Sequence, residues 1–119
     1  MKPMKLSIIL LALCIAPGMV NIAAAADAEA GLLAVKALGN ANGQALACSQ
    51  MQAAARAKSL MLAHAPKTPR FGAAYEEATQ EAFIAQTRSG KACADATELT
   101  ARLNQLALQL SETLPVTAK

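Results

Sequence analysis

The sequence lacks most of the residues with which proteins build reaction centres. It has one histidine, His64, and it contains no CxxC pair, no glycine-rich phosphate loop and no haem-attachment motif. A catalytic site needs a nucleophile with its base, carboxylates with separated pKa values, or a metal with several ligands. We therefore predict that the protein is not an enzyme, and we expect no cofactor.

The sequence also lacks the patterns of β-strands. After residue 26, no stretch alternates apolar and polar residues over several positions, and none runs through β-branched residues. Alanine and leucine instead recur at helical spacing. This predicts an all-α fold, a small disulfide-stapled array of three main helices plus a shorter N-terminal helix.

Residues 1–26 have the three parts of a secretory signal peptide. Lys2 and Lys5 give a basic start, an apolar run follows from Leu6 to Ala16, and four alanines precede Asp27. The apolar run is too short to span a bilayer, which needs about 20 residues. We expect cleavage after Ala25 or Ala26, a single domain over 27–119, and a protein that works in the periplasm or is secreted.

Few charges remain once the signal is removed. Lys2 and Lys5 leave with it, so nine basic and eight acidic residues give a net charge of +1 instead of +3. This predicts no nucleic-acid binding. Because the short apolar run leaves with the signal, we also expect no stable membrane insertion. Cys14 lies within the signal, but Leu13 precedes it where a lipid-modified cysteine requires a small residue, which argues against lipidation.

Two cysteines remain after cleavage, Cys48 and Cys93. An even pair in a small exported domain is typical of a disulfide, and we predict one here. A metal or redox pair is the alternative, but the missing CxxC and the single histidine disfavour it.

Turn and cap residues divide the mature chain into four helical stretches. Gly39 to Gly43 holds two glycines and two asparagines, which is typical of a turn. Pro66 and Pro69 bound a second loop, and Ser89-Gly90 a third. The predicted helices are 27–38, a central alanine-rich one within 40–66 with Cys48 near its start, 69–88, and one that follows an Asp95 cap and ends at Leu114.

Apolar spacing indicates how these helices pack. The last helix has leucines at 99, 103, 106 and 110, the clearest stripe in the chain. The central helix is apolar on two sides, so we expect little of it to face water. In the third helix, Phe71, Ala74, Tyr75, Ala78, Ala82 and Ala85 form the predicted inner stripe.

Phe83 and Ile84 lie off that stripe and are the first candidates for a partner contact. Lys67 and Arg70, in the second loop, form a modest basic patch and are the second. The partner is an unidentified protein, with a homodimer left open. Met51, Met61 and His64 suggest a copper(I) site, but methionines at such positions are more often core residues.

In layout, an exported helical domain with one long-range disulfide resembles the acid-stress chaperones of the bacterial periplasm. The resemblance covers architecture and no residue string, and it implies a protein that loosens at low pH and exposes apolar surface. Our main prediction is a non-enzymatic exported protein that acts by protein-protein binding, as an accessory component of an envelope assembly. The acid-stress chaperone and a carrier of copper or a small apolar ligand are the alternatives.

Overall fold

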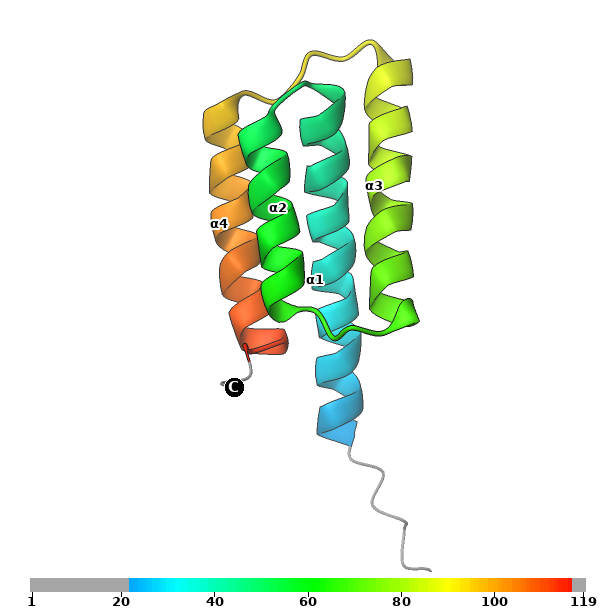
Figure 1. Ribbon diagram of the computed structural model, residues 1–119, viewed down its shortest axis with the longest axis vertical. Coiled ribbons are helices and arrows are strands. Elements are labelled where there is room, and N and C mark those ends of the chain that lie inside the picture. Colours follow the sequence, from blue (N-terminus) through cyan, green and yellow to red (C-terminus); the bar gives the residue numbers. More distant parts are fainter. Residues whose placement is uncertain (1–21, 117–119) are drawn as a thin grey trace, which may run out of the picture.

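The computed structural model describes the backbone of residues 22–116 and consists of four α-helices in that part of the chain (Figure 1). These are α1 (Ile22–Ala47), α2 (Met51–His64), α3 (Pro69–Ser89) and α4 (Ala96–Thr113). No strand occurs among the described residues. The predicted all-α fold class is therefore confirmed, although α1, with 26 residues, is the longest helix and not a shorter one.

Consecutive helices run antiparallel, and α1 is the element that contacts all the others (Figure 1). Helices α1, α2 and α4 pack against one another, whereas α3 packs chiefly on α1. The molecule is thus a three-helix bundle with a fourth helix attached to one side of α1. This arrangement leaves a groove along each flank of the α1–α3 contact.

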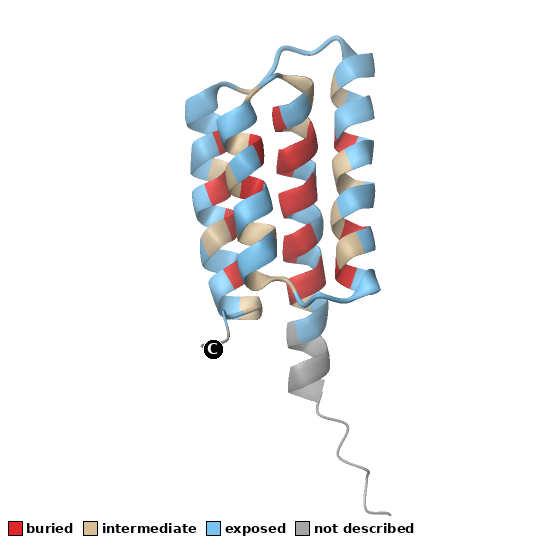
Figure 2. Cartoon of the chain, viewed as in Figure 1, coloured by how far each residue is buried: buried red, intermediate tan, exposed pale blue. Residues whose placement is uncertain are grey.

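The core consists of leucine and alanine side chains around α1. Buried residues follow α1 through the bundle, as Figure 2 shows in red. The predicted stripe of α4 is confirmed, since Leu99, Leu103, Leu106 and Leu110 are all buried. From α1, Val35 and Leu38 are fully buried between them and the other helices.

The predicted boundary between the first two helices is wrong. Residues Gly39 to Gly43 do not form a turn but lie within α1, which continues to Ala47. The chain turns instead at Ser49, whose φ is +56°, the left-handed region that non-glycine residues seldom adopt. The central helix is therefore α2, which begins only at Met51, after Cys48.

The predicted burial of the central helix is also wrong. Only Ala54 and Ala57 of α2 are buried, while Met51 and Leu62 are more than half exposed. The helix enclosed by others is α1, because the three remaining helices all pack around it.

Sequence signals at the ends of α3 and α4 are confirmed. Pro69 takes the first position of α3, and Gly90 ends the helix with a φ of +66°. Asp95 caps α4, since its Oδ1 accepts a hydrogen bond of 2.8 Å from the Glu98 amide.

Most of the predicted signal peptide, including Cys14, lies outside the described residues. Of residues 1–26, only 22–26 are described, as the first turns of α1. Within the described range, no helix has the length and apolar character that a membrane span requires.

Candidate functional site

A disulfide joins the two turns at one end of the bundle, as predicted. Cys48 and Cys93 are bonded, with Cα atoms 5.9 Å apart. Beside them, Gln50 Nε2 donates a hydrogen bond of 2.6 Å to the Ala94 carbonyl. The α1–α2 turn is thus fixed to the α3–α4 connection. The C-terminal end of α3 is therefore held near the C-terminal end of α1.

Two glycines let α3 approach α1 closely. A Cβ atom built on Gly39 would lie 2.5 Å from the Tyr75 carbonyl oxygen and 2.9 Å from the Ala78 Cβ. At Gly43, one turn later, a Cβ would overlap the Thr79 carbonyl oxygen. The missing side chains therefore bring two backbones together, and this contact sets the position of every side chain on the flanks of α3.

A buried polar link spans the same contact. Asn42 is only 8% exposed, and its Nδ2 donates to Thr79 Oγ1 over 3.2 Å. The Thr79 hydroxyl in turn donates to the Tyr75 carbonyl oxygen over 2.8 Å. A buried amide without such a partner would cost about 1–3 kcal/mol, so this link fixes the rotation of α3 relative to α1.

An apolar groove, which we call the Phe83 groove, lies beside this link. It has a volume of about 470 Å³. Its large apolar side chains are Leu46 from α1 and Phe83 from α3, which stay 38% and 41% exposed, together with the half-buried Tyr75. The complete lining is Asn42, Leu46, Tyr75, Glu76, Thr79, Gln80 and Phe83.

A second hollow of about 300 Å³ continues the Phe83 groove toward α2. It shares Asn42, Leu46 and Tyr75 with the groove and adds Ala54, Ala55 and Lys58. We call it the Lys58 hollow. Tyr75, from α3, lines both spaces.

Tyr75 carries an unsatisfied polar atom. Its hydroxyl is buried and has no hydrogen-bond partner among the described residues. Burial also raises the pKa of the Tyr75 phenol, because the low-dielectric surroundings disfavour the phenolate. The hydroxyl is therefore neutral at ordinary pH and available as a donor.

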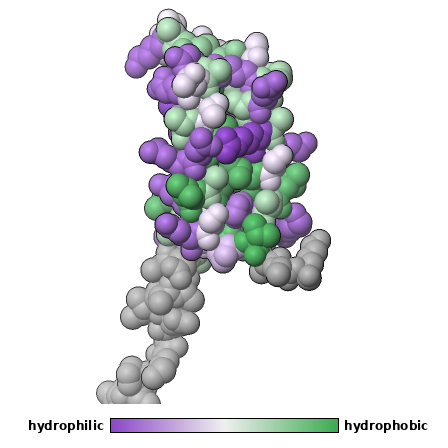
Figure 3. Space-filling model, turned by 90° about the vertical axis from the view of Figure 1, so that its left-hand side faces the viewer, coloured by the Kyte–Doolittle hydropathy of each residue, from purple (hydrophilic) through white to green (hydrophobic). Residues whose placement is uncertain are grey.

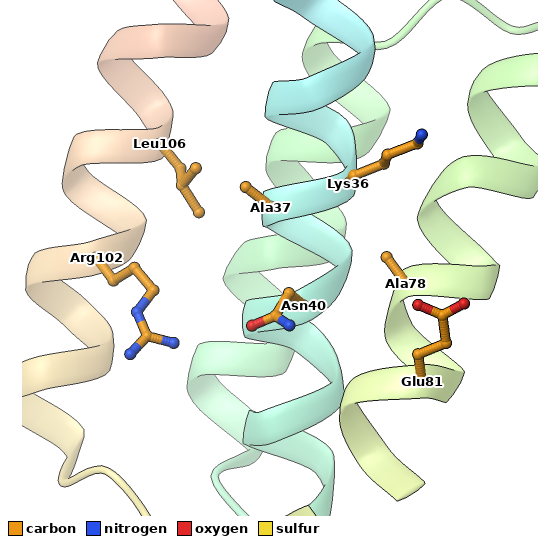
Figure 4. A pocket seen from close by; sticks show the side chains of 7 residues that line it. All are labelled: Lys36, Ala37, Asn40, Ala78, Glu81, Arg102 and Leu106. Carbon is orange, nitrogen blue, oxygen red and sulfur yellow. The ribbon is translucent and has the colours of Figure 1, made fainter. Parts of the chain in front are cut away.

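The opposite flank of the α1–α3 contact has a different character. A hollow of about 460 Å³ lies there between α3, α1 and α4, lined by Ala37, Ala78 and Leu106 and by the polar Lys36, Asn40, Glu81 and Arg102 (Figure 4). Arg102 is engaged, since it donates to Gln44 Oε1 over 2.7 Å and lies 3.8 Å from Glu98 Oε1. Leu106 is the one large apolar residue of this lining and is buried, so the hollow offers no exposed apolar anchor.

The structure separates the four predicted partner-contact residues. Phe83 lies in the groove, whereas its neighbour Ile84, 37% exposed, is not part of the lining. Lys67 and Arg70 lie near the other end of α3, and Arg70 Nη2 forms an exposed ion pair with Glu29 Oε2 at 3.0 Å. Leu46 and Tyr75 were not predicted as site residues. Leu46 falls within the predicted central helix, and Tyr75 belongs to the predicted inner stripe of the third helix.

The residues of the predicted copper alternative are spread along α2, with Met51 at its start and His64 at its end. Met51 is 55% exposed at the start of α2, and Met61 packs against the core. His64 Nδ1 lies 2.8 Å from the Leu114 carbonyl oxygen, which can only accept, so this nitrogen carries the proton. Here the histidine connects the ends of α2 and α4.

Apolar side chains are also exposed at that end of the bundle. Figure 3 views the molecule from the α4 side and shows hydrophilic residues over much of the face, with the strongest green in its lower half. Leu62 and Leu108 are 59% and 68% exposed there. Leu62 lines a hollow of about 900 Å³ together with Leu114 and Val116. Among the described residues, however, the one buried hydroxyl without a partner belongs to Tyr75, which lines the Phe83 groove.

Comparisons of this chain with protein-family models, with curated proteins and with solved structures gave no match.

Proposed function

We propose that this is an exported, non-enzymatic protein that acts by binding a segment of another protein in the Phe83 groove, as an accessory component of an envelope assembly. The observation that supports this most directly is the exposure of Leu46 and Phe83 on either side of one apolar hollow. Aromatic side chains are enriched at the buried centre of protein-protein contacts, where a few well-packed residues carry most of the binding energy.

The packing of α3 explains why this surface is open. Since α3 packs chiefly on α1, no other helix among residues 22–116 packs closely against its flank that carries Phe83. The groove is nevertheless rigid, because the two glycines, the Asn42–Thr79 link and the disulfide all fix α3 in place. A rigid apolar surface binds at lower entropic cost than one that must first be ordered.

Export is supported by the signal-like composition of residues 1–26 and by the disulfide, which is compatible with an oxidising compartment. We expect the protein recovered from the envelope or the medium to begin at Ala26 or Asp27. Intact-mass measurement without reductant checks this, and it should also show the mass of the oxidised cysteine pair. A full-length cytoplasmic protein in which Cys48 and Cys93 are free thiols contradicts the export proposal.

Two neighbouring residues on α3 provide a matched test of the groove. Phe83→Ser should weaken binding of the partner about tenfold or more, because it removes an apolar anchor. Ile84→Ser removes a side chain of similar exposure outside the groove and should leave binding unchanged. The measurement is recovery of crosslinked partner from the envelope fraction on the immobilised mature protein, compared with the unmodified protein.

Circular dichroism of both variants provides the control for folding, since both side chains are substantially exposed. Equal loss of binding in the two variants contradicts the groove as the site. Global unfolding of Phe83→Ser alone assigns Phe83 to the core, and the matched comparison is then made with Leu46→Ser.

A further inference from the structure

The combined lining of the Phe83 groove and the Lys58 hollow carries opposite charges on its two sides. Lys58, on the α2 side, brings a cation, and Glu76, on the α3 side, brings an anion. The ion pairs among the described residues are Glu29–Arg70 and Glu98–Arg102, so neither lining charge is neutralised within this part of the chain. A segment bound here meets positive charge on the α2 side and negative charge on the α3 side.

Tyr75, whose hydroxyl is buried without a hydrogen-bond partner, lines the same hollow as Lys58. Lys58 and the neutral tyrosine are both hydrogen-bond donors, and they line the same hollow. A buried hydroxyl without a partner is destabilising, and an incoming acceptor removes that penalty. The hydroxyl is buried, so side chains that line the hollow must shift before an acceptor reaches it.

We infer that the partner segment carries an acidic side chain beside a large apolar one, with the carboxylate at Lys58 and the Tyr75 hydroxyl and the apolar side chain against Leu46 and Phe83. A carboxylate is an acceptor without donors, and it matches two donors of which one is charged. Glu76 repels a second acid on the α3 side and so fixes the direction of the segment. This inference rests on the proposed function, and it specifies the chemistry of the partner.

Selection of peptides from a random displayed library on the immobilised mature protein tests it without knowledge of the partner. Peptides that need Phe83, as judged by loss of binding to Phe83→Ser, should be enriched in Asp or Glu next to an apolar residue. Selection on Lys58→Glu should enrich Lys or Arg at that position instead. Lys91→Glu, the same charge change at an exposed residue outside the groove, should select the same acidic peptides as the unmodified protein.

One selected peptide then gives the energetics. Tyr75 is the only tyrosine and the chain has no tryptophan. Binding of a peptide without tyrosine or tryptophan can therefore be followed by the fluorescence emission of Tyr75. Changing the acidic peptide residue to its amide should weaken binding about tenfold to the unmodified protein and much less to Lys58→Gln. This comparison isolates the coupling between the two charges.

The outcomes separate this inference from the proposed function. Peptides that need Phe83 but show no acidic preference overturn the inference and leave the groove as a protein-binding site. An equal effect of the amide change on the unmodified protein and on Lys58→Gln likewise overturns it. A failure to select any peptide that depends on Phe83 contradicts the proposed function, and the inference with it.

Discussion

Replacement of both Cys48 and Cys93 with serine is expected to lower the free energy of unfolding by about 4 kcal/mol. The bond joins residues 45 positions apart, and a crosslink over a loop of that length removes much of the conformational entropy of the unfolded chain. Single domains are typically stable by only about 5–15 kcal/mol. Urea denaturation followed by circular dichroism should therefore show a large decrease in the unfolding midpoint.

The same experiment on the unmodified protein in the presence of a thiol reductant is the control. Reduction should reproduce the midpoint of the serine variant, because both remove the bond and leave the remaining sequence in place. A loss of less than about 1 kcal/mol in both cases, within the range of one hydrogen bond, contradicts the prediction. Noncovalent contacts between the α1–α2 turn and the α3–α4 connection, such as that of Gln50 with Ala94, would then be sufficient to hold the two segments together.

The elements that the sequence predicts well are those whose signals are local. A stripe of leucines with an aspartate cap defines α4, and proline at the start with glycine at the end defines α3. Each signal has one dominant physical cause, which acts within a few residues. The disulfide is predicted because two cysteines allow only one pairing.

The Gly39 to Gly43 segment was misassigned because glycine has two uses. It adopts the conformations of a turn, and it also removes the side chain where two backbones meet. The sequence shows where the glycines are but not which part of the fold packs against them. In the structure, the backbone of α3 packs against them. The spacing of the glycines by four residues, which places both on one helix face, was the signal for the second use.

The candidate site was predicted in part for the same reason. Phe83 was identified because it lies off the apolar stripe of its own helix, which is a local property. Leu46 and Tyr75 join it only because α1 continues through the glycines and α3 packs against it in one register. No pattern within a single helix shows which residues of two helices will line a common groove.

Gly43→Ala tests the close α1–α3 contact, and we expect it to lower the free energy of unfolding by about 2 kcal/mol. Alanine favours helix by as much as about 1 kcal/mol relative to glycine, so local propensity alone predicts stabilisation. The new Cβ, however, would overlap the Thr79 carbonyl oxygen and lie 2.8 Å from the Ala82 Cβ and 2.9 Å from the Phe83 amide nitrogen. Backbone atoms cannot move aside as a side chain can, so α3 must shift.

The glycine of α3 itself supplies a matched control. A Cβ on Gly72 meets no atom within 4 Å, so Gly72→Ala should raise the stability by about 0.5–1 kcal/mol through helix propensity alone. The stability of Gly31→Ala should be intermediate, because the atoms nearest to its new Cβ belong to the flexible Leu114 side chain. Urea midpoints in the order Gly72→Ala, unmodified protein, Gly31→Ala, Gly43→Ala support close backbone packing. A stabilising Gly43→Ala would instead show that the two helices lie farther apart.

Because the shift of α3 also displaces Phe83 from Leu46, Gly43→Ala should weaken partner binding, whereas Gly72→Ala should leave it unchanged.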